Sequence, residues 1–367
     1  MLLQAQTRVD SLQLEFRSTT IDSIKIEILF RLFQQYQFDS LDKAKEVSLH
    51  AIALAQQTKN WRLLAVAYNQ YANFLTSQSS PDSAIAMYQK GLEWAERANF
   101  DSEQQAALTG LGSNYLRKGD FPKALEYKEQ GVKFAEEIGD EEGIASAYKA
   151  KADIYLELAE YTKAMEFYTM ASEKFLALNN RKGIAITLAN IGLLQWKMEN
   201  YKSSESYLIR SDSIFKELDF QPGRAFVLTN LGIVYKNGGD LDKSITYYTK
   251  ALDSYQSMGD LHNVGLVNYN MGNVFWDKED INAAINYYKK SLDICIQTND
   301  SLHMSYSYKA LGDSYRELGN NKEAKYYLLK AINNQFAKVL VFCPLYQQLQ
   351  FQPLISFFEF VLGKGIQ

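Results

Sequence analysis

The chain has 367 residues, more than one compact core usually takes, so several domains or an elongated array are expected. Its formal net charge of −4, from 39 basic and 43 acidic residues, offers no basic excess or stripe for nucleic-acid phosphates, so no nucleic-acid partner is expected. With 2 cysteines it has no disulfide framework, and Cys295, among the apolar residues of "LDICIQ", is expected to be a buried free thiol.

Residues 1–20 form an N-terminal segment that is expected to be irregular or helical. Its start, "MLLQAQTRVDSL", lacks the charged and apolar regions of a signal peptide, although "LLQAQ" is similar to the last residues of one. The cytoplasm is therefore favoured, and the periplasm if the true start lies upstream. No apolar run reaches the ~18 residues of a transmembrane helix, so no membrane span is expected.

From residue 21 to 338 the sequence repeats every 40 residues, as "LGSNYLRKGD" at 111–120 and "LGDSYRELGN" at 311–320 illustrate. Stepping by 40 gives two columns that hold only Ala, Gly or Ser in all eight repeats. They are Ala44, Ala84, Ala124, Ala164, Ser204, Ser244, Ala284 and Ala324, and Ala51, Gly91, Gly131, Ala171, Ser211, Ala251, Ser291 and Ala331. A third column reads Leu32, Ala72, Gly112, Ala152, Gly192, Gly232, Gly272 and Gly312.

Each repeat is expected to contain a helix A, a tight turn, a helix B and a short link. Apolar and small residues recur every three or four positions, and "GGD" and "LGN" are helix stops. Small side chains allow close helix approach, so the Gly112 column should meet the Ala124 column, and the Gly131 column should receive the next helix A. Aromatic columns such as those of Tyr115 and Tyr127 fill the remaining space, and the repeats must stack to bury their apolar faces.

This pattern resembles the tetratricopeptide repeat (TPR), whose usual unit has about 34 residues. The resemblance implies an all-α fold, a right-handed α-solenoid of eight helix-turn-helix units over residues 21–338. Similar lengthened repeats occur in TPR proteins that regulate G-protein signalling, in kinesin light chains and in bacterial signalling regulators. The first repeat departs from the pattern at Leu32 and Gln35, which favours a capping role.

The final residues, 339–367, are apolar, and Pro344 and Pro353 interrupt helix formation there. This tail is expected to cap the last repeat. A membrane-surface or partner-helix role, and a truncated or out-of-frame end, are the alternatives.

By the same resemblance, helices A line a concave groove. Asn190, Asn230 and Asn270 occupy one helix A position in three successive repeats, and in several TPR proteins such a ladder holds a peptide backbone. The alternative is that these side chains bridge neighbouring helices. Tyr269 and Asn273 are expected beside the ladder.

A second helix A column holds Trp196, Lys236, Trp276 and Arg316, for which half-buried packing of the two tryptophans is favoured. The Lys and Asn pair with which chaperone-binding TPR domains hold a carboxylate is missing, so that function is disfavoured.

Catalytic and metal-binding motifs are sparse. No HExxH, GxSxG or GxxxxGK[ST] occurs, so neither an enzyme nor a cofactor is expected. His262 and His303 lie near the starts of successive helices A, close to Asp260 and Asp300, but zinc needs three or four ligands, so no metal site is expected.

The favoured hypothesis is therefore a non-catalytic scaffold that binds a peptide or protein segment in its groove. The alternative is the sensory region of a bacterial histidine kinase or cyclase that lacks its output domain.

Overall fold

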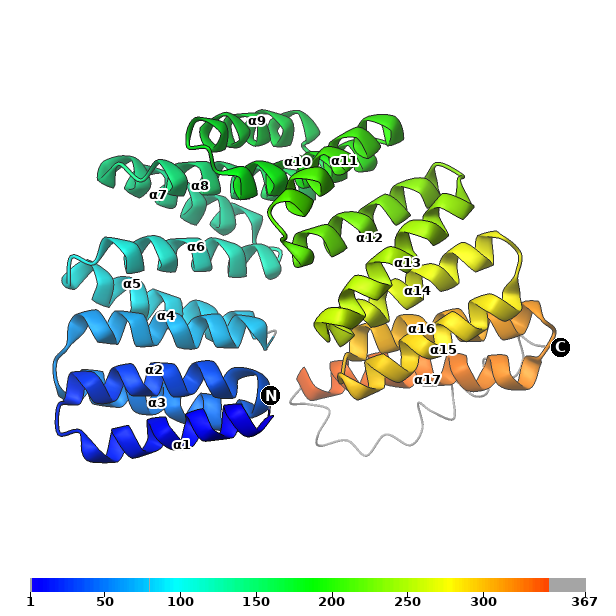
Figure 1. Cartoon of the computed structure of the whole chain (residues 1–367). Coiled ribbons are helices and arrows are strands. Elements are labelled where there is room, and N and C mark those ends of the chain that lie inside the picture. Colours follow the sequence, from blue (N-terminus) through cyan, green and yellow to red (C-terminus); the bar gives the residue numbers. More distant parts are fainter. Residues whose placement is uncertain (1, 79, 343–367) are drawn as a thin grey trace. The chain divides into compact units, whose positions relative to one another are not determined.

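The computed structural model describes residues 2–78 and 80–342, and they form an all-α structure in two compact units that divide between residues 198 and 199 (Figure 1). The helices of the first unit are α1 Leu2–Ser18, α2 Asp22–Asp39, α3 Leu41–Gln57, α4 Trp61–Ser77, α5 Pro81–Arg97, α6 Asp101–Arg117, α7 Phe121–Ile138, α8 Glu141–Glu157, α9 Tyr161–Ala177 and α10 Arg181–Lys197. Those of the second unit are α11 Tyr201–Glu217, α12 Gln221–Asn237, α13 Leu241–Met258, α14 Leu261–Asp277, α15 Ile281–Gln297, α16 Ser301–Glu317 and α17 Asn321–Phe342.

Helices follow one another at a regular spacing, which confirms the predicted helix pairs. From α3 onward each helix begins 20 residues after the previous one. The turns contain a left-handed residue, which is glycine at Gly119 and Gly239 (φ 76° and 86°) but Ala159 and Glu199 at the equivalent positions. Glycine relieves strain at some turns, but the turn geometry does not depend on it.

Small residues lie where the helices of a repeat cross. Ser244 on α13 donates a hydrogen bond to the carbonyl oxygen of Gly232 on α12 at 2.7 Å, so these two columns meet as predicted. The ring of Tyr248 also packs against Gly232, which the sequence did not predict. A Cβ added to Gly232 would lie 2.6 Å from this ring.

The third small column behaves differently from one repeat to another. Ser291 lies 3.2 Å from Ser307 on the following helix A, measured between hydroxyl oxygens, as the sequence predicts. Gly91 instead faces Asn69 on helix A of its own repeat, since an added Cβ would collide with the Asn69 amide. The prediction is therefore confirmed at Ser291, whereas at Gly91 the nearest side chain belongs to the same repeat and itself bonds to Glu103 on the next helix A.

The aromatic columns stack within the repeats, each ring on the ring twelve residues later. The pairs are Tyr115–Tyr127, Tyr155–Phe167, Tyr235–Tyr247, Phe275–Tyr287 and Tyr315–Tyr327, with centroids 5.1 to 5.5 Å apart and planes within 10° of parallel. Such pairs each add roughly 0.5–1.5 kcal/mol beyond their burial. In the fifth repeat Gln195 replaces the first ring.

At the N-terminal end, α1 covers the first repeat, with Val9 and Leu12 buried in the core that also contains Leu32. At the other end α17 continues to Phe342 and so includes the first four residues of the predicted capping tail, 339–367; the rest of the tail lies outside the described residues. Cys295 is a buried free thiol, as predicted. Within the described part of the chain, no helix has the length and apolar character needed to cross a membrane.

Candidate functional site

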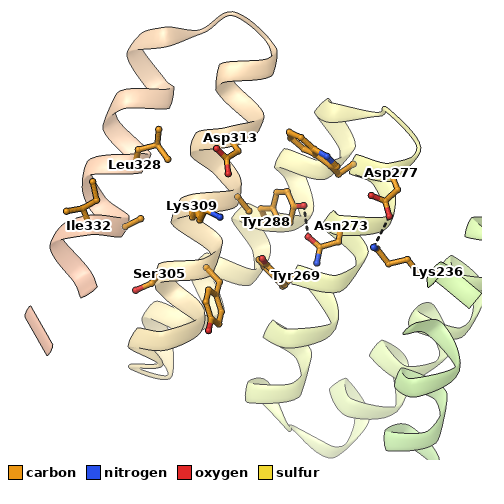
Figure 2. Close-up of a pocket in the computed structure, with 14 residues that line it drawn as sticks. Lys236, Tyr269, Asn273, Asp277, Tyr288, Ser305, Lys309, Asp313, Leu328 and Ile332 are labelled. Atoms are coloured by element: carbon orange, nitrogen blue, oxygen red, sulfur yellow. Dashed lines mark hydrogen bonds and ion pairs between the residues drawn. The ribbon is translucent and has the colours of Figure 1, made fainter. Parts of the chain in front are cut away.

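A cavity of about 990 Å³ lies in the second unit and is lined mainly by α14, α16 and α17 (Figure 2). Tyr269, Asn273 and Trp276 line it from α14, and Tyr306, Lys309 and Asp313 from α16. Tyr288 of α15 and Leu328 and Ile332 of α17 complete much of the wall. Its size is typical of a ligand site, and it combines rings with a few polar groups.

Aromatic rings form one side of this cavity. The Tyr269 ring centroid lies 5.5 Å from that of Tyr288 and 6.4 Å from that of Tyr306. Burial is the main cause that raises the pKa of Tyr269 and of Tyr288. Both phenols therefore stay neutral near neutral pH and can pack against apolar groups.

Most polar groups of the cavity already have partners. The Tyr288 hydroxyl donates to Asn273 Oδ1 at 2.8 Å, and Lys236 Nζ lies 2.8 Å from Asp277 Oδ2 (Figure 2). Asp313 Oδ1 pairs with Arg316 at 2.9 Å.

Several donor groups of the cavity have no hydrogen-bond partner within the described residues. They include the Lys309 ammonium and the Asn273 side-chain NH₂, whose oxygen alone is engaged, and the hydroxyls of Tyr269 and Tyr306. The cavity therefore offers hydrogen-bond donors beside aromatic rings, which suits carbonyl or carboxylate oxygens on an otherwise apolar ligand.

The three ladder asparagines occupy three different environments. Asn190 donates from Nδ2 to Asp153 Oδ1 at 2.9 Å, and so bridges to the preceding helix A as the alternative interpretation had it. Asn230 is buried and donates to the carbonyl oxygen of Phe226 in its own helix at 3.0 Å. Asn270 is half-buried, and none of the described residues is its hydrogen-bond partner. The ladder residues do not line the large cavity, whereas Tyr269 and Asn273 do.

A smaller cavity of about 460 Å³ lies in the first unit, around Asp153. The carboxylate of Asp153 receives Lys149 Nζ at 2.8 Å on one oxygen. Its other oxygen accepts the Tyr168 hydroxyl at 2.6 Å and the Asn190 amide at 2.9 Å. These protein groups satisfy one another, so this cavity offers a ligand less than the cavity of the second unit.

Lys309 and Tyr306 line the cavity but were not singled out by the sequence. One signal was available for Lys309, because it and Asp313 repeat the spacing of Lys149 and Asp153. Trp276 is half-buried as predicted, but it also lines the cavity, together with Lys236 of the same column.

The profile of the tetratricopeptide repeat matches residues 103–176, 183–257 and 263–335, more than half of the sequence. The chain belongs to the tetratricopeptide repeat family. No curated protein matches it.

Solved structures share this TPR fold at low sequence identity. A Rap protein complexed with Competence and Sporulation Factor is 16% identical, with a TM-score of 0.64 over 91% of this chain and 93% of that one. Aspartyl phosphate phosphatase F from Bacillus subtilis is 17% identical, with a TM-score of 0.58 over 90% and 89%.

A third similar structure is a signal transduction ATPase with a TPR sensor from Pyrococcus horikoshii, 18% identical with a TM-score of 0.60. The match covers 86% of this chain and 46% of that one. At these identities the likeness establishes the fold, which is that of bacterial regulators among others.

Proposed function

We propose that this TPR protein is a non-catalytic scaffold that binds an extended peptide or protein segment in the cavity of the second unit. The observation that carries the proposal is the position of Lys309 and Asn273. Both present donors without described partners beside Tyr269 and Tyr306. An extended segment exposes backbone carbonyl oxygens for such donors, and its side chains can pack on the rings.

The similar structures support a binding role through their fold. One of them, the Rap protein, was solved in complex with a separate factor. The stacked repeats of the second unit also give a surface on which an extended partner can lie.

The first prediction tests the cavity with peptides selected from a random displayed library on the full-length chain. Trp276 lines the cavity and is the only tryptophan in the second unit, so a bound peptide should change its fluorescence. Lys309→Met should weaken the binding of the selected peptides by roughly ten- to a hundredfold, because a charge-assisted hydrogen bond is worth about 1.5–3 kcal/mol.

Lys149→Met is the matched control, since Lys149 holds the equivalent position in the first unit and is paired with Asp153. It should leave peptide affinity unchanged. Equal losses in the two variants, or no loss in Lys309→Met, would place the peptide outside this cavity.

The asparagine ladder is a separate part of the proposal. Asn270→Ala should weaken the binding of an extended ligand, because the Asn270 amide has no partner among the described residues. Asn230→Ala should mainly lower folding stability, because the Asn230 amide bonds to the carbonyl oxygen of Phe226. Peptide affinity that Asn270→Ala leaves unchanged would remove the ladder from the site.

A further inference from the structure

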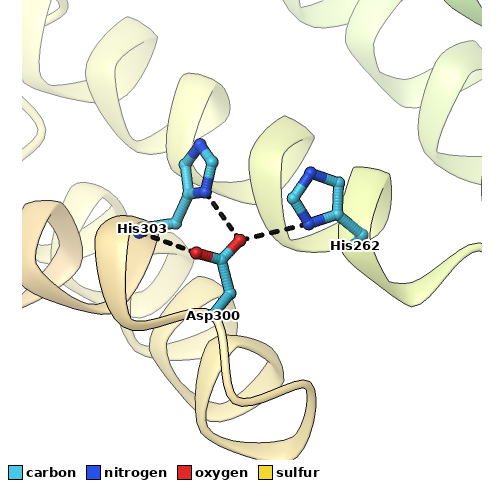
Figure 3. A group of neighbouring side chains, drawn as sticks. All are labelled: His262, Asp300 and His303. Atoms are coloured by element: carbon cyan, nitrogen blue, oxygen red, sulfur yellow. Dashed lines mark hydrogen bonds and ion pairs between the residues drawn. The ribbon is translucent and has the colours of Figure 1, made fainter. Parts of the chain in front are cut away.

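Three potential metal ligands meet beside the first turns of α14 and α16 in the second unit (Figure 3). Asp300 Oδ2 lies 2.7 Å from Nδ1 of His303 and 3.1 Å from Nδ1 of His262. One ligand atom from each residue falls within 4.8 Å of the other two. The imidazoles come from successive helices A and point at the same carboxylate oxygen.

Local structure holds two of these ligands in place. Asp300 is the N-cap of α16, and its other oxygen, Oδ1, accepts the backbone N–H of His303 at 3.1 Å. The His303 ring also packs edge-on against Tyr306, with centroids 6.0 Å apart. His262 is more exposed, with 56% of its side chain accessible, so it can rotate toward an ion and leaves room for water.

The chemistry of the set fits a borderline divalent transition metal. Imidazole nitrogen suits Zn²⁺, Ni²⁺ and Cu²⁺, and the carboxylate supplies an oxygen ligand. The nearby Asp260 is not part of the set, because both of its oxygens accept hydrogen bonds from Asn263.

We propose that His262, Asp300 and His303 form a binding site for a divalent transition metal ion that links the seventh and eighth repeats. The ion binds the Nδ1 atoms of the two histidines and Oδ2 of Asp300, and it replaces the hydrogen-bonding protons between these atoms. Each imidazole is then neutral, with its proton on Nε2. Water completes the coordination, as in three-ligand zinc sites. The site does not depend on the proposed peptide cavity, whose residues are different.

The test is calorimetric titration of the untagged full-length chain with zinc chloride, repeated with cobalt chloride to record visible absorption. One equivalent of Zn²⁺ should bind with a Kd of about 10 µM or tighter. His262→Gln and His303→Gln should each weaken binding by more than about tenfold, as expected for loss of a direct ligand. Asp300→Asn should do the same and can still act as an N-cap, so its fold is expected to survive.

His50→Gln is the matched control, because His50 is the remaining histidine and lies in the first unit against Phe16. It should leave binding unchanged. Circular dichroism of each variant separates a lost ligand from a lost fold. Binding weaker than about 1 mM, or binding that persists in the double variant His262→Gln/His303→Gln, would overturn the proposal. The three side chains would then be only a hydrogen-bonded group around the N-cap of α16.

Discussion

Lys149 and Asp153 in α8 occupy the same repeat positions as Lys309 and Asp313 in α16, four repeats later. In the first unit the lysine and aspartate form an ion pair at 2.8 Å. In the second unit Asp313 pairs with Arg316, and Lys309 has no ionic partner among the described residues. The same two residue types therefore give a closed network in one unit and an available ammonium group in the other.

Two replacements accompany this difference: Arg316 stands where the fourth repeat has Leu156, and the side chain fifteen residues after the aspartate also differs. Tyr168, on helix B, donates its hydroxyl to Asp153 at 2.6 Å and fixes the carboxylate. At the equivalent position of the last repeat stands Leu328, which cannot donate a hydrogen bond. Asp313 pairs with Arg316 of its own helix, and both Asp313 and Leu328 line the large cavity.

The second prediction, with the largest expected effect on stability, removes the two aspartates. Asp153→Ala should lower the free energy of unfolding by roughly 3 kcal/mol, because it leaves the buried Tyr168 hydroxyl without its acceptor and Lys149 without its partner. Asp313→Ala should cost less than about 1 kcal/mol, because its ion-pair partner Arg316 is exposed and no tyrosine hydroxyl depends on Asp313 as acceptor in the described residues. Urea unfolding followed by circular dichroism measures both, and similar losses would contradict the comparison.

The third prediction concerns Lys128, which stands where Tyr168 and Tyr288 stand in other repeats. It is buried, donates to the Thr109 carbonyl oxygen at 2.7 Å and lies 3.0 Å from Ser113 Oγ. Burial, with a smaller contribution from Lys149, lowers the pKa of Lys128 to about 8. The unfolded chain then binds more protons than the folded chain between that pKa and the ordinary lysine pKa of about 10.4.

For Lys128, folding stability should therefore rise with pH across this window. Lys128→Met should be more stable than the parent near pH 7, and the gap should shrink by about 2 kcal/mol by pH 9.5. Urea unfolding at several pH values tests this. If the stability difference between Lys128→Met and the parent stays constant with pH, burial does not lower the pKa of Lys128.

The fourth prediction, with the smallest effect, compares two tyrosine hydroxyls. Tyr168→Phe removes a hydrogen bond to a carboxylate and should cost about 2 kcal/mol. Tyr288→Phe removes a bond to the neutral amide of Asn273 and should cost about 1 kcal/mol. Thermal unfolding of the two variants measures the difference. A larger loss of stability in Tyr288→Phe than in Tyr168→Phe would mean that the Tyr288 hydrogen bond is the stronger of the two.

Much of the site was harder to predict than the fold. The sequence placed Tyr269 and Asn273 on the correct helix, and the structure brings both to the large cavity. It treated Asn190, Asn230 and Asn270 as equivalent because they share a column, yet Asn190 reaches Asp153 and Asn230 bonds to its own helix. The repeat position of a residue determines the place of its Cα in the helix pair. Its hydrogen-bond partners depend on residues at other repeat positions and on other helices.

The histidines show the same limit. Their positions near successive helix starts were visible in the sequence, but Asp300 could be recognised as their shared partner only once the caps of α14 and α16 were in place.

By itself the sequence determined the helix pairs, the stride of 40 residues and the small and aromatic columns that pack them, because close packing of helices restricts residue size at every crossing. Only the tertiary structure decided which polar groups are satisfied and which remain available. Hydrogen bonds are short and directional, so a few replacements, such as Leu328 for tyrosine and Arg316 for leucine, go with a different partner for the carboxylate while the repeat itself is kept.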